Sequence, residues 1–142
     1  MFKKILVATD ASEYSRRAFK TALDLAQKFQ AKIVLLFVAY TPEAYWGYNS
    51  AYTIEITREQ IEERGKLTLE ETLEGIDVKD VSVEKKMIQG HPSTVIIEEV
   101  VKENIDLVVM GSHGYGPIAG AVLGSVSQRV LRKATCPVLI VK

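Results

Sequence analysis

The sequence alternates between short, nearly continuous apolar runs and segments with helical periodicity. The apolar runs are residues 5–8, 32–38, 105–110 and 137–141. A run that is apolar at successive positions, and not at every second one, is typical of a strand covered on both faces, as in a parallel sheet. Parallel strands need crossover connections, which are usually helices. The alternation therefore predicts an α/β fold.

Helix signals lie between these runs. Ser12 is placed to cap a first helix, whose apolar residues recur at helical spacing as far as Phe29. Thr57 and Gln60 fit a capping box that opens a charged helix, which Gly75 ends. The four expected helices cover about residues 13–29, 58–74, 92–103 and 125–133.

A fifth strand is expected at residues 81–88, which alternate in part and carry charge, as edge strands do. The chain then has five strands and four helices in a single domain, residues 1–142. Right-handed crossovers between these strands predict a three-layer, doubly wound sandwich. Ligands of such sheets bind beyond the carboxyl ends of the strands, where the strand order reverses.

Residues 39–57 interrupt this order with a long segment that lacks a clear period. Loops of this length inside a compact domain are usually functional or mobile. Two interpretations stay open: the aromatic rings form a lid over a ligand or a partner surface, or they pack over the floor of their own loop. The aromatic residues are Tyr40, Tyr45, Trp46, Tyr48 and Tyr52.

The composition gives no support for several function classes. Eighteen basic residues balance eighteen acidic ones, which gives no support for a nucleic-acid or anionic-membrane partner. The single cysteine, Cys136, fits a reducing compartment. The first apolar run is shorter than the ~7–15 residues of a secretory signal, and no segment approaches the ~18–20 apolar residues of a membrane span. We therefore expect a cytoplasmic protein.

The histidines and the cysteine do not form a recognisable catalytic or metal-binding pattern. His91, His113 and Cys136 lack metal-ligand spacing. No nucleophile, base and orienting group stand in an evident set. His91 is expected at a helix start, Cys136 is expected to be a buried thiol, and His113 either touches a ligand or holds a turn.

Residues 111–127, GSHGYGPIAGAVLGSVS, place five glycines between an apolar run and a helix start. Such a loop brings backbone N–H groups close to a phosphate, because no Cβ stands in the way. The helix N-terminus adds its positive dipole end, and Ser125 and Ser127 offer hydroxyl donors. The alternative is a flexible connection without a ligand.

Two familiar phosphate-binding patterns do not fit this stretch. A P-loop fails because Pro117 stands where its lysine is required. A dinucleotide-binding fingerprint fails because Gly114, Gly116 and Gly120 miss its spacing. The pattern that does fit is Gly-x2-Gly-x9-Gly-Ser, beginning at Gly111 and ending at Ser125.

With that pattern, the opening ILVATDAS and the ending ATCPVLIV, the chain resembles the universal stress protein family (UspA-like), in particular its ATP-binding branch. The resemblance covers essentially the whole chain. It implies a Rossmann-like fold of the adenine nucleotide alpha hydrolase type, with a five-stranded parallel sheet in the order 3-2-1-4-5.

The resemblance also implies an ATP site, with magnesium held through the phosphates near Asp10 and no metal bound directly by the protein. Asp10 would lie by the ribose or the phosphates; the alternative for it is a turn carboxylate. Val38 would contact adenine through its backbone, and Met110 would border the ribose and adenine. The implied nucleotide-binding residues are Ala8, Thr9, Asp10, Val38, Met110, Gly111, Gly114, Gly124, Ser125 and Val126.

The implied function is nucleotide-dependent regulation in a stress response, with slow or no ATP hydrolysis. The implied assembly is a homodimer through the last strand, Pro137 to Val141, whose apolar edge would pair with a second copy. Two alternatives stay open: a slow ATPase or other nucleotide-hydrolysing enzyme, and a nucleotide-free dimeric adaptor. Tyr115 departs from the family pattern, which often has a cation there.

Overall fold

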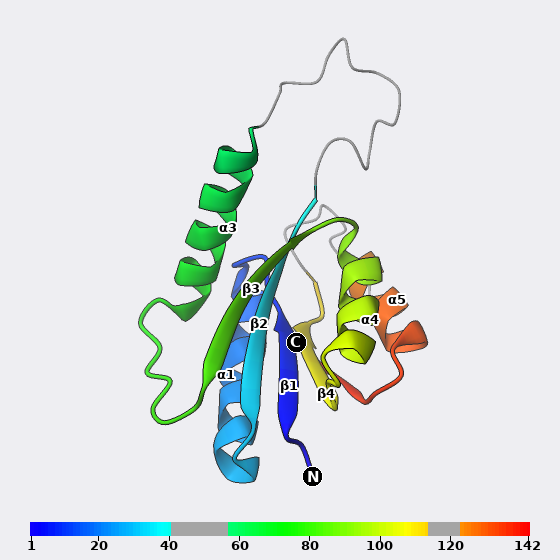
Figure 1. Cartoon of the computed structure of the whole chain (residues 1–142). Coiled ribbons are helices and arrows are strands. Elements are labelled where there is room, and N and C mark those ends of the chain that lie inside the picture. Colours follow the sequence, from blue (N-terminus) through cyan, green and yellow to red (C-terminus); the bar gives the residue numbers. More distant parts are fainter. Residues whose placement is uncertain (41–56, 114–122) are drawn as a thin grey trace.

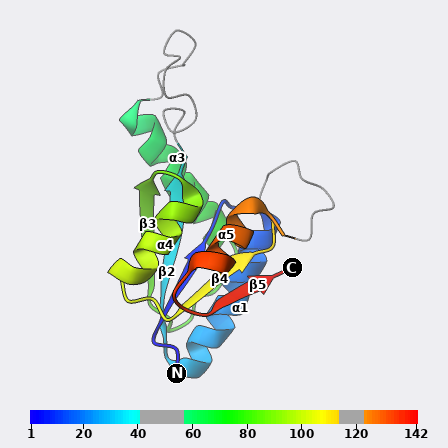
Figure 2. The same cartoon turned by 90° about the vertical axis from the view of Figure 1, so that its right-hand side faces the viewer.

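The computed structural model describes residues 1–40, 57–113 and 123–142. Its five strands form one parallel sheet in the order β3-β2-β1-β4-β5, which confirms the expected fold and strand order (Figure 1 and Figure 2). The strands are β1 (Lys4–Ala8), β2 (Lys32–Ala39), β3 (Val83–Gln89), β4 (Leu107–Gly111) and β5 (Val138–Val141).

Helices in the described part of the chain cover both faces of the sheet. α1 (Glu13–Phe29) and α3 (Arg58–Leu73) lie on one face. α4 (Pro92–Lys102) and α5 (Ser125–Lys133) lie on the other, and Figure 2 shows them in front of the strands with α1 behind. None of these described helices is long and apolar enough to cross a bilayer.

β1 is buried on both faces at the centre of the sheet. Ile5 and Val7 pack into the cluster beneath α1 and α3, whereas Leu6 packs into the cluster beneath α4 and α5; all three are fully buried. This explains why the run is apolar at every position. Burial of each such side chain contributes about 1.5–3 kcal/mol.

The two expected helix caps are present. The Ser12 hydroxyl accepts a hydrogen bond from the Ser15 backbone N–H and begins α1. At the start of α3, the Thr57 hydroxyl accepts from the Gln60 N–H, and the Gln60 side chain accepts from the Thr57 N–H. Both helices therefore begin where the sequence predicts.

The expected start of the fourth strand is wrong by two residues. β4 begins at Leu107, and Asp106 lies before it. The Asp106 carboxylate accepts hydrogen bonds from the backbone N–H groups of Lys3, at 2.8 Å, and Lys4, at 3.2 Å. Its side chain thus caps the start of β1, which is a role that hydrophobic periodicity does not reveal.

The first turn of α1 lies tightly against the end of β4. A Cβ atom placed on Gly111 would stand 2.7 Å from the Tyr14 Cβ and 2.9 Å from the Tyr14 carbonyl carbon. Glycine at this position therefore lets the helix approach the strand end. The contact fixes α1 relative to the carboxyl edge of the sheet.

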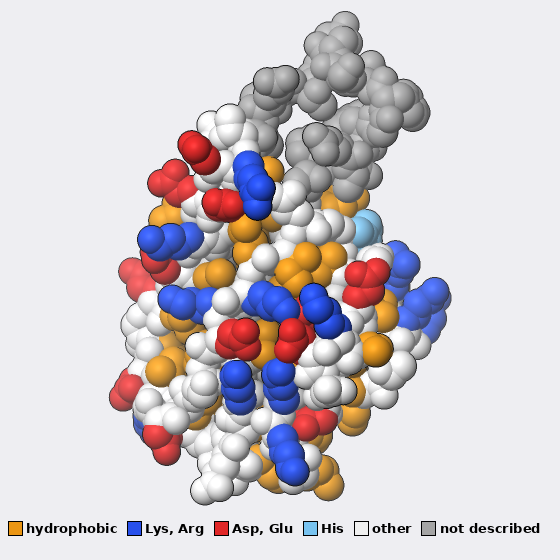
Figure 3. Space-filling view, in the orientation of Figure 1, with side chains coloured by type: hydrophobic (Ala, Val, Ile, Leu, Met, Phe, Trp, Pro, Cys, Tyr) orange, Lys and Arg blue, Asp and Glu red, His pale blue; other side chains and the backbone are white. Residues whose placement is uncertain are grey.

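An ion-pair network joins β3, α4 and β1. The Lys86 ammonium lies 2.7 Å from the Glu99 carboxylate and 3.0 Å from that of Glu103, and Lys4 lies 2.9 Å from Glu103 on its other side. Hydrogen bonds from Lys4 and Lys86 lower the pKa of Glu103 from 4.5 to about 2. Figure 3 shows basic and acidic side chains intermixed on the face of the molecule that it displays.

The substitution Gly111→Ala is expected to lower the free energy of unfolding by about 1–3 kcal/mol, because the added methyl group overpacks the contact with the Tyr14 backbone. Chemical denaturation measures this change. Gly124→Ala is the matched control, since its Cβ would stand 3.4 Å from the Ser112 carbonyl oxygen, an ordinary contact distance, and its cost is expected to stay under about 1 kcal/mol. Equal losses for both variants would contradict the account.

The Glu103 pKa also predicts a pH dependence of stability. Because the folded protein holds this proton less tightly than the unfolded chain, Glu103 stabilises the fold above pH 4.5, and the contribution is lost as the pH falls toward about 2. Thermal unfolding across this range should therefore show a smaller decrease in midpoint for Glu103→Gln than for the wild type. Parallel curves for the two proteins would contradict the prediction.

Candidate functional site

A cavity of about 280 Å³ opens at the carboxyl ends of β1, β2 and β4. The chain leaves β1 toward α1 on one face and leaves β4 toward α5 on the other, so the strand order reverses between these two strands. Nine of the ten predicted nucleotide-binding residues line this cavity, and the tenth, Gly114, lies outside the described residues. The nine are Ala8, Thr9, Asp10, Val38, Met110, Gly111, Gly124, Ser125 and Val126.

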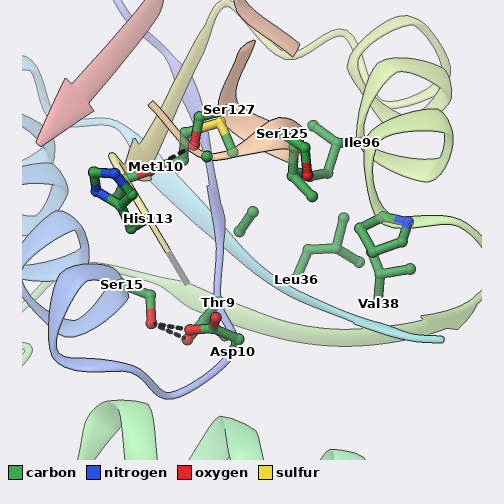
Figure 4. A pocket seen from close by; sticks show the side chains of 15 residues that line it. Thr9, Asp10, Ser15, Leu36, Val38, Ile96, Met110, His113, Ser125 and Ser127 are labelled. Carbon is green, nitrogen blue, oxygen red and sulfur yellow. Dashed lines mark hydrogen bonds between the residues drawn. The ribbon is translucent and has the colours of Figure 1, made fainter. Parts of the chain in front are cut away.

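One side of the cavity is apolar. Figure 4 shows Leu36, Val38 and Ile96 there, opposite the polar side chains of Asp10, Ser15 and His113. Leu36 and Ile96 are buried in the core between the sheet and α4. A flat apolar ring that carries a polar chain is the type of molecule that suits such a two-sided cavity.

The backbone of Val38 faces the crevice. The Leu36 carbonyl accepts from the Thr9 N–H on the β1 side, and the Ala39 carbonyl accepts from the Gly90 N–H on the β3 side. Backbone groups alternate along a strand, so Val38 presents its N–H and C=O on the same side as Leu36, beyond the last residue of β1. This places a donor and an acceptor side by side at the apolar end of the cavity.

The start of α5 forms another side of the cavity. Gly124 is the N-cap, and no side chain of the described residues caps this end of the helix. The first N–H groups of a helix have no partner within it and carry its positive dipole end. Ser125 and Val126 are the first two helical residues and line the cavity, so their backbone amides suit an anion.

Two hydrogen bonds hold the start of α5 against the end of β4. The Gly124 N–H donates to the Ser112 carbonyl at 2.7 Å, and the Ser127 hydroxyl donates to the Gly111 carbonyl at 2.8 Å. The sequence suggests Ser127 as a hydrogen-bond donor to phosphate, but in the structure its hydroxyl donates to the protein backbone. Its role in this structure is to position the helix.

Asp10 fulfils the turn role that was its alternative interpretation. Its Oδ1 atom accepts from the Ser12 backbone N–H at 2.9 Å and from the Ser15 hydroxyl at 3.1 Å. The same carboxylate lines the cavity, and the two interpretations are compatible because the hydrogen bonds fix the side chain at the cavity wall. Thr9 is buried beside it, and its hydroxyl contacts Ser15 and Thr72.

The two histidines have different surroundings. His91 is the N-cap of α4, as expected, and its Nδ1 lies 3.1 Å from the Ser93 hydroxyl. His113 lines the cavity; its Nδ1 lies 3.0 Å from the Ser112 hydroxyl, and its ring lies 5.4 Å from that of Tyr14. His113 therefore holds local structure and faces the cavity at once.

Of the aromatic segment between Tyr40 and Tyr52, Tyr40 alone lies within the described residues. Its ring meets that of His91 edge to face, with the ring centroids 5.4 Å apart. Tyr115 and the other aromatic residues of the segment lie outside the described ranges.

Four lining residues were not predicted from the sequence: Ser15, Leu36, Pro92 and Ile96. Pro92 and Ile96 belong to α4, which reaches the cavity through the crossover from β3. The sequence marks Pro92 as a helix start and Ile96 as a core residue. No local signal distinguishes such residues from ligand contacts. Ser15 lies one turn before Ala18 on the buried side of α1, so helical spacing could have indicated its burial but not its place at the cavity.

Burial raises the pKa of the Cys136 thiol, which keeps it protonated near neutral pH. Among residues 1–40, 57–113 and 123–142, no three His, Cys, Asp or Glu side chains lie close enough together to hold a metal ion. Of the described lining residues, none is Lys or Arg.

Solved structures similar to the chain share its fold and in some cases contain an adenine nucleotide. The protein MJ0577 is 29% identical, with a TM-score of 0.81 over 100% of this chain and 96% of that one. An Arabidopsis thaliana universal stress protein with AMP bound is 26% identical, with a TM-score of 0.70 over 99% and 91%. A universal stress protein in complex with cAMP is 26% identical, with a TM-score of 0.67 over 99% and 96%.

The sequence itself matches the model of the universal stress protein family over residues 1–142. It is 34% identical to universal stress protein YxiE of Bacillus subtilis over 148 aligned residues, which cover 100% of both chains. With the strand order, the crevice and the glycine spacing, these matches agree on one assignment. The chain belongs to the universal stress protein family.

Proposed function

We propose that this protein binds ATP, together with magnesium, in the crevice at the carboxyl ends of β1, β2 and β4. The observation that carries the proposal is the pairing of an apolar slot at Val38 with the open start of α5 in one cavity. Adenine presents an amino donor next to ring-nitrogen acceptors. The N–H and C=O of Val38 complement that pattern.

The phosphates belong at the start of α5 in this proposal. The amides of Ser125 and Val126 would bind phosphate oxygens, and the helix dipole would favour their negative charge. Magnesium would balance the remaining charge near Asp10, since this ion is commonly held by one carboxylate and substrate phosphates. The relatives with AMP or cAMP bound support an adenine nucleotide as the ligand.

The proposed role is regulatory, with slow or no hydrolysis of ATP. Fast phosphoryl transfer uses cations that neutralise the developing charge. None of the described lining residues is Lys or Arg, and Asp10 and His113 are both engaged in hydrogen bonds with their neighbours. A single-turnover assay separates the proposal from a slow ATPase: intact ATP after hours supports regulation, and rapid release of ADP contradicts it.

We further propose a cytoplasmic homodimer that forms through β5. This strand is at the edge of the sheet, and its residue Leu139 is 37% exposed. An apolar edge strand is a template for pairing with another chain. Light scattering at micromolar concentration should give twice the chain mass of 15.8 kDa, and a monomer mass would contradict the dimer.

Calorimetric titration with ATP and magnesium tests the proposed site directly, and Ser125→Asp is the most informative variant. A carboxylate at the first position of α5 is expected to weaken ATP binding at least about tenfold, because it repels the phosphates. The same carboxylate interacts favourably with the positive end of the helix dipole. The thermal unfolding midpoint of the variant should therefore equal or exceed that of the wild type. Affinity and stability therefore move in opposite directions.

Ser125→Asn is the matched control, because it adds a neutral side chain of similar size. Its affinity for ATP should remain close to that of the wild type. A titration that shows no ATP binding by the wild type would overturn the nucleotide proposal. Equal binding by Ser125→Asp and Ser125→Asn would place the phosphates elsewhere.

A further inference from the structure

Thr72 is a buried polar residue on a helix that is mostly charged and exposed. It is fully buried, in the last turn of α3. Its hydroxyl oxygen lies 2.8 Å from the Thr68 carbonyl oxygen and 2.7 Å from the Thr9 hydroxyl oxygen, and its single proton can be donated to either of them. The second contact joins α3 to the end of β1 across 63 positions in the sequence.

From Thr9 the hydrogen bonds continue to the cavity wall. The Thr9 hydroxyl donates to the Ser15 hydroxyl at 3.1 Å. The Ser15 hydroxyl in turn has two acceptors for its proton, Oδ1 of Asp10 at 3.1 Å and the Ser12 carbonyl oxygen at 3.0 Å. Figure 4 shows Ser15 turned toward Asp10 beside Thr9. Thr72, Thr9 and Ser15 are all buried, so bulk water does not compete for these contacts.

We propose that Thr72 is a positioning residue: through Thr9 and Ser15 it holds the Asp10 carboxylate at the nucleotide site, and it thereby couples the docking of α3 to nucleotide binding. This inference rests on the proposed function, because it assigns a regulatory input to the same site. The input is the position of α3.

The connection runs in one direction when Thr72 donates its proton to Thr9 in place of the Thr68 carbonyl. Each hydroxyl has one proton and can accept as well, so a chain of hydroxyls can donate successively toward one acceptor. A carboxylate is a stronger acceptor than a hydroxyl, and Asp10 stands at one end of this chain. Hydrogen bonds in such a chain polarise and strengthen each other, and the low dielectric of the interior adds to the effect.

A second contact holds the same turn of α3 to α1. The Arg16 guanidinium donates to the carbonyl of Glu74, the C-cap residue of α3. Arg16 follows Ser15 directly, so the end of α3 is attached to the turn of α1 that carries the Asp10 contact. Any displacement of α3 therefore acts on the residues that orient Asp10.

Coupling of this kind is reciprocal. If α3 must be docked for Asp10 to be in place, then a ligand on Asp10 must also favour the docked position of α3. A partner or a modification that moves α3 would weaken nucleotide binding, and bound nucleotide would oppose that movement. The structure thus contains a route by which nucleotide state reaches a surface helix.

The substitution Thr72→Val tests the proposal by calorimetric titration with ATP and magnesium. It keeps the shape of the side chain and removes the hydroxyl, so the affinity is expected to decrease about five- to tenfold. Thr68→Val is the matched control, because Thr68 makes the same kind of hydrogen bond, to the Arg64 carbonyl, one turn earlier on α3 and does not contact Thr9. Its affinity should equal that of the wild type.

Thr72→Ser separates the hydroxyl from the packing of the residue. It retains the hydroxyl and removes the methyl group, so it should lose stability and keep nearly the full affinity. A loss of affinity in Thr72→Ser as large as in Thr72→Val would overturn the proposal, because packing would then be the cause. Equal affinities of Thr72→Val and the wild type would overturn it as well.

Hydrogen exchange of the wild type provides a readout that does not depend on any variant. ATP with magnesium should slow the exchange of the backbone amides in the last two turns of α3, although these turns do not line the cavity. Unchanged exchange in α3 with ATP bound would overturn this inference alone. Absence of ATP binding by the wild type would overturn the proposed function and this inference with it.

Discussion

The structure depends on the burial of β1 between two cores. Ile5 and Val7 face one cluster and Leu6 faces the other, so helices must cover both sides of the sheet. β1 pairs with β2 on one edge and with β4 on the other. The crossovers that follow β1 and β4 leave toward opposite faces, and the crevice lies where they separate. The position of the site is therefore a consequence of the topology.

Within that crevice, much of the proposed binding chemistry belongs to the backbone. The groups that face the cavity are the peptide of Val38 and the first amides of α5, while Ser127 and Ser112 hold α5 in position through hydrogen bonds. Backbone groups do not depend on side-chain identity. This is why the sequence signal of the site is a spacing of small residues and lacks a catalytic triad or a metal-binding set.

Much of the fold was predictable from the sequence. The apolar runs marked the buried strands, and Ser12 and Thr57 marked helix starts, because these signals are local. Contacts between distant segments were not predictable in this way. Asp106 caps the start of β1, and Thr72 meets Thr9, because the folded chain brings together residues about 100 and 63 positions apart. The lining residue Ile96 looks like any other core residue until α4 is placed.

The residues of the candidate site also divide into those that local signals predict and those that depend on how distant segments pack. Residues just beyond strand ends, such as Asp10 and Gly111, were predicted because a general rule about parallel sheets locates them, whereas Met110 was implied by the family resemblance. The supporting contacts beneath them, from Thr9 to Thr72, follow from how α3 packs, which no periodicity specifies. The family resemblance implied an adenine nucleotide as the ligand. The geometry of the crevice is the basis of the proposal for how this chain would bind it.

The central claim is that one crevice holds adenine at Val38 and phosphates at the start of α5. Backbone amide chemical shifts during a titration with ATP and magnesium test it most directly. We expect the largest shift changes with ATP at Val38, Asp10, Ser125 and Val126. AMP should reproduce the change at Val38 and give a weaker change at Ser125. Shift changes confined to another surface of the protein, or none at saturating ATP, would contradict it.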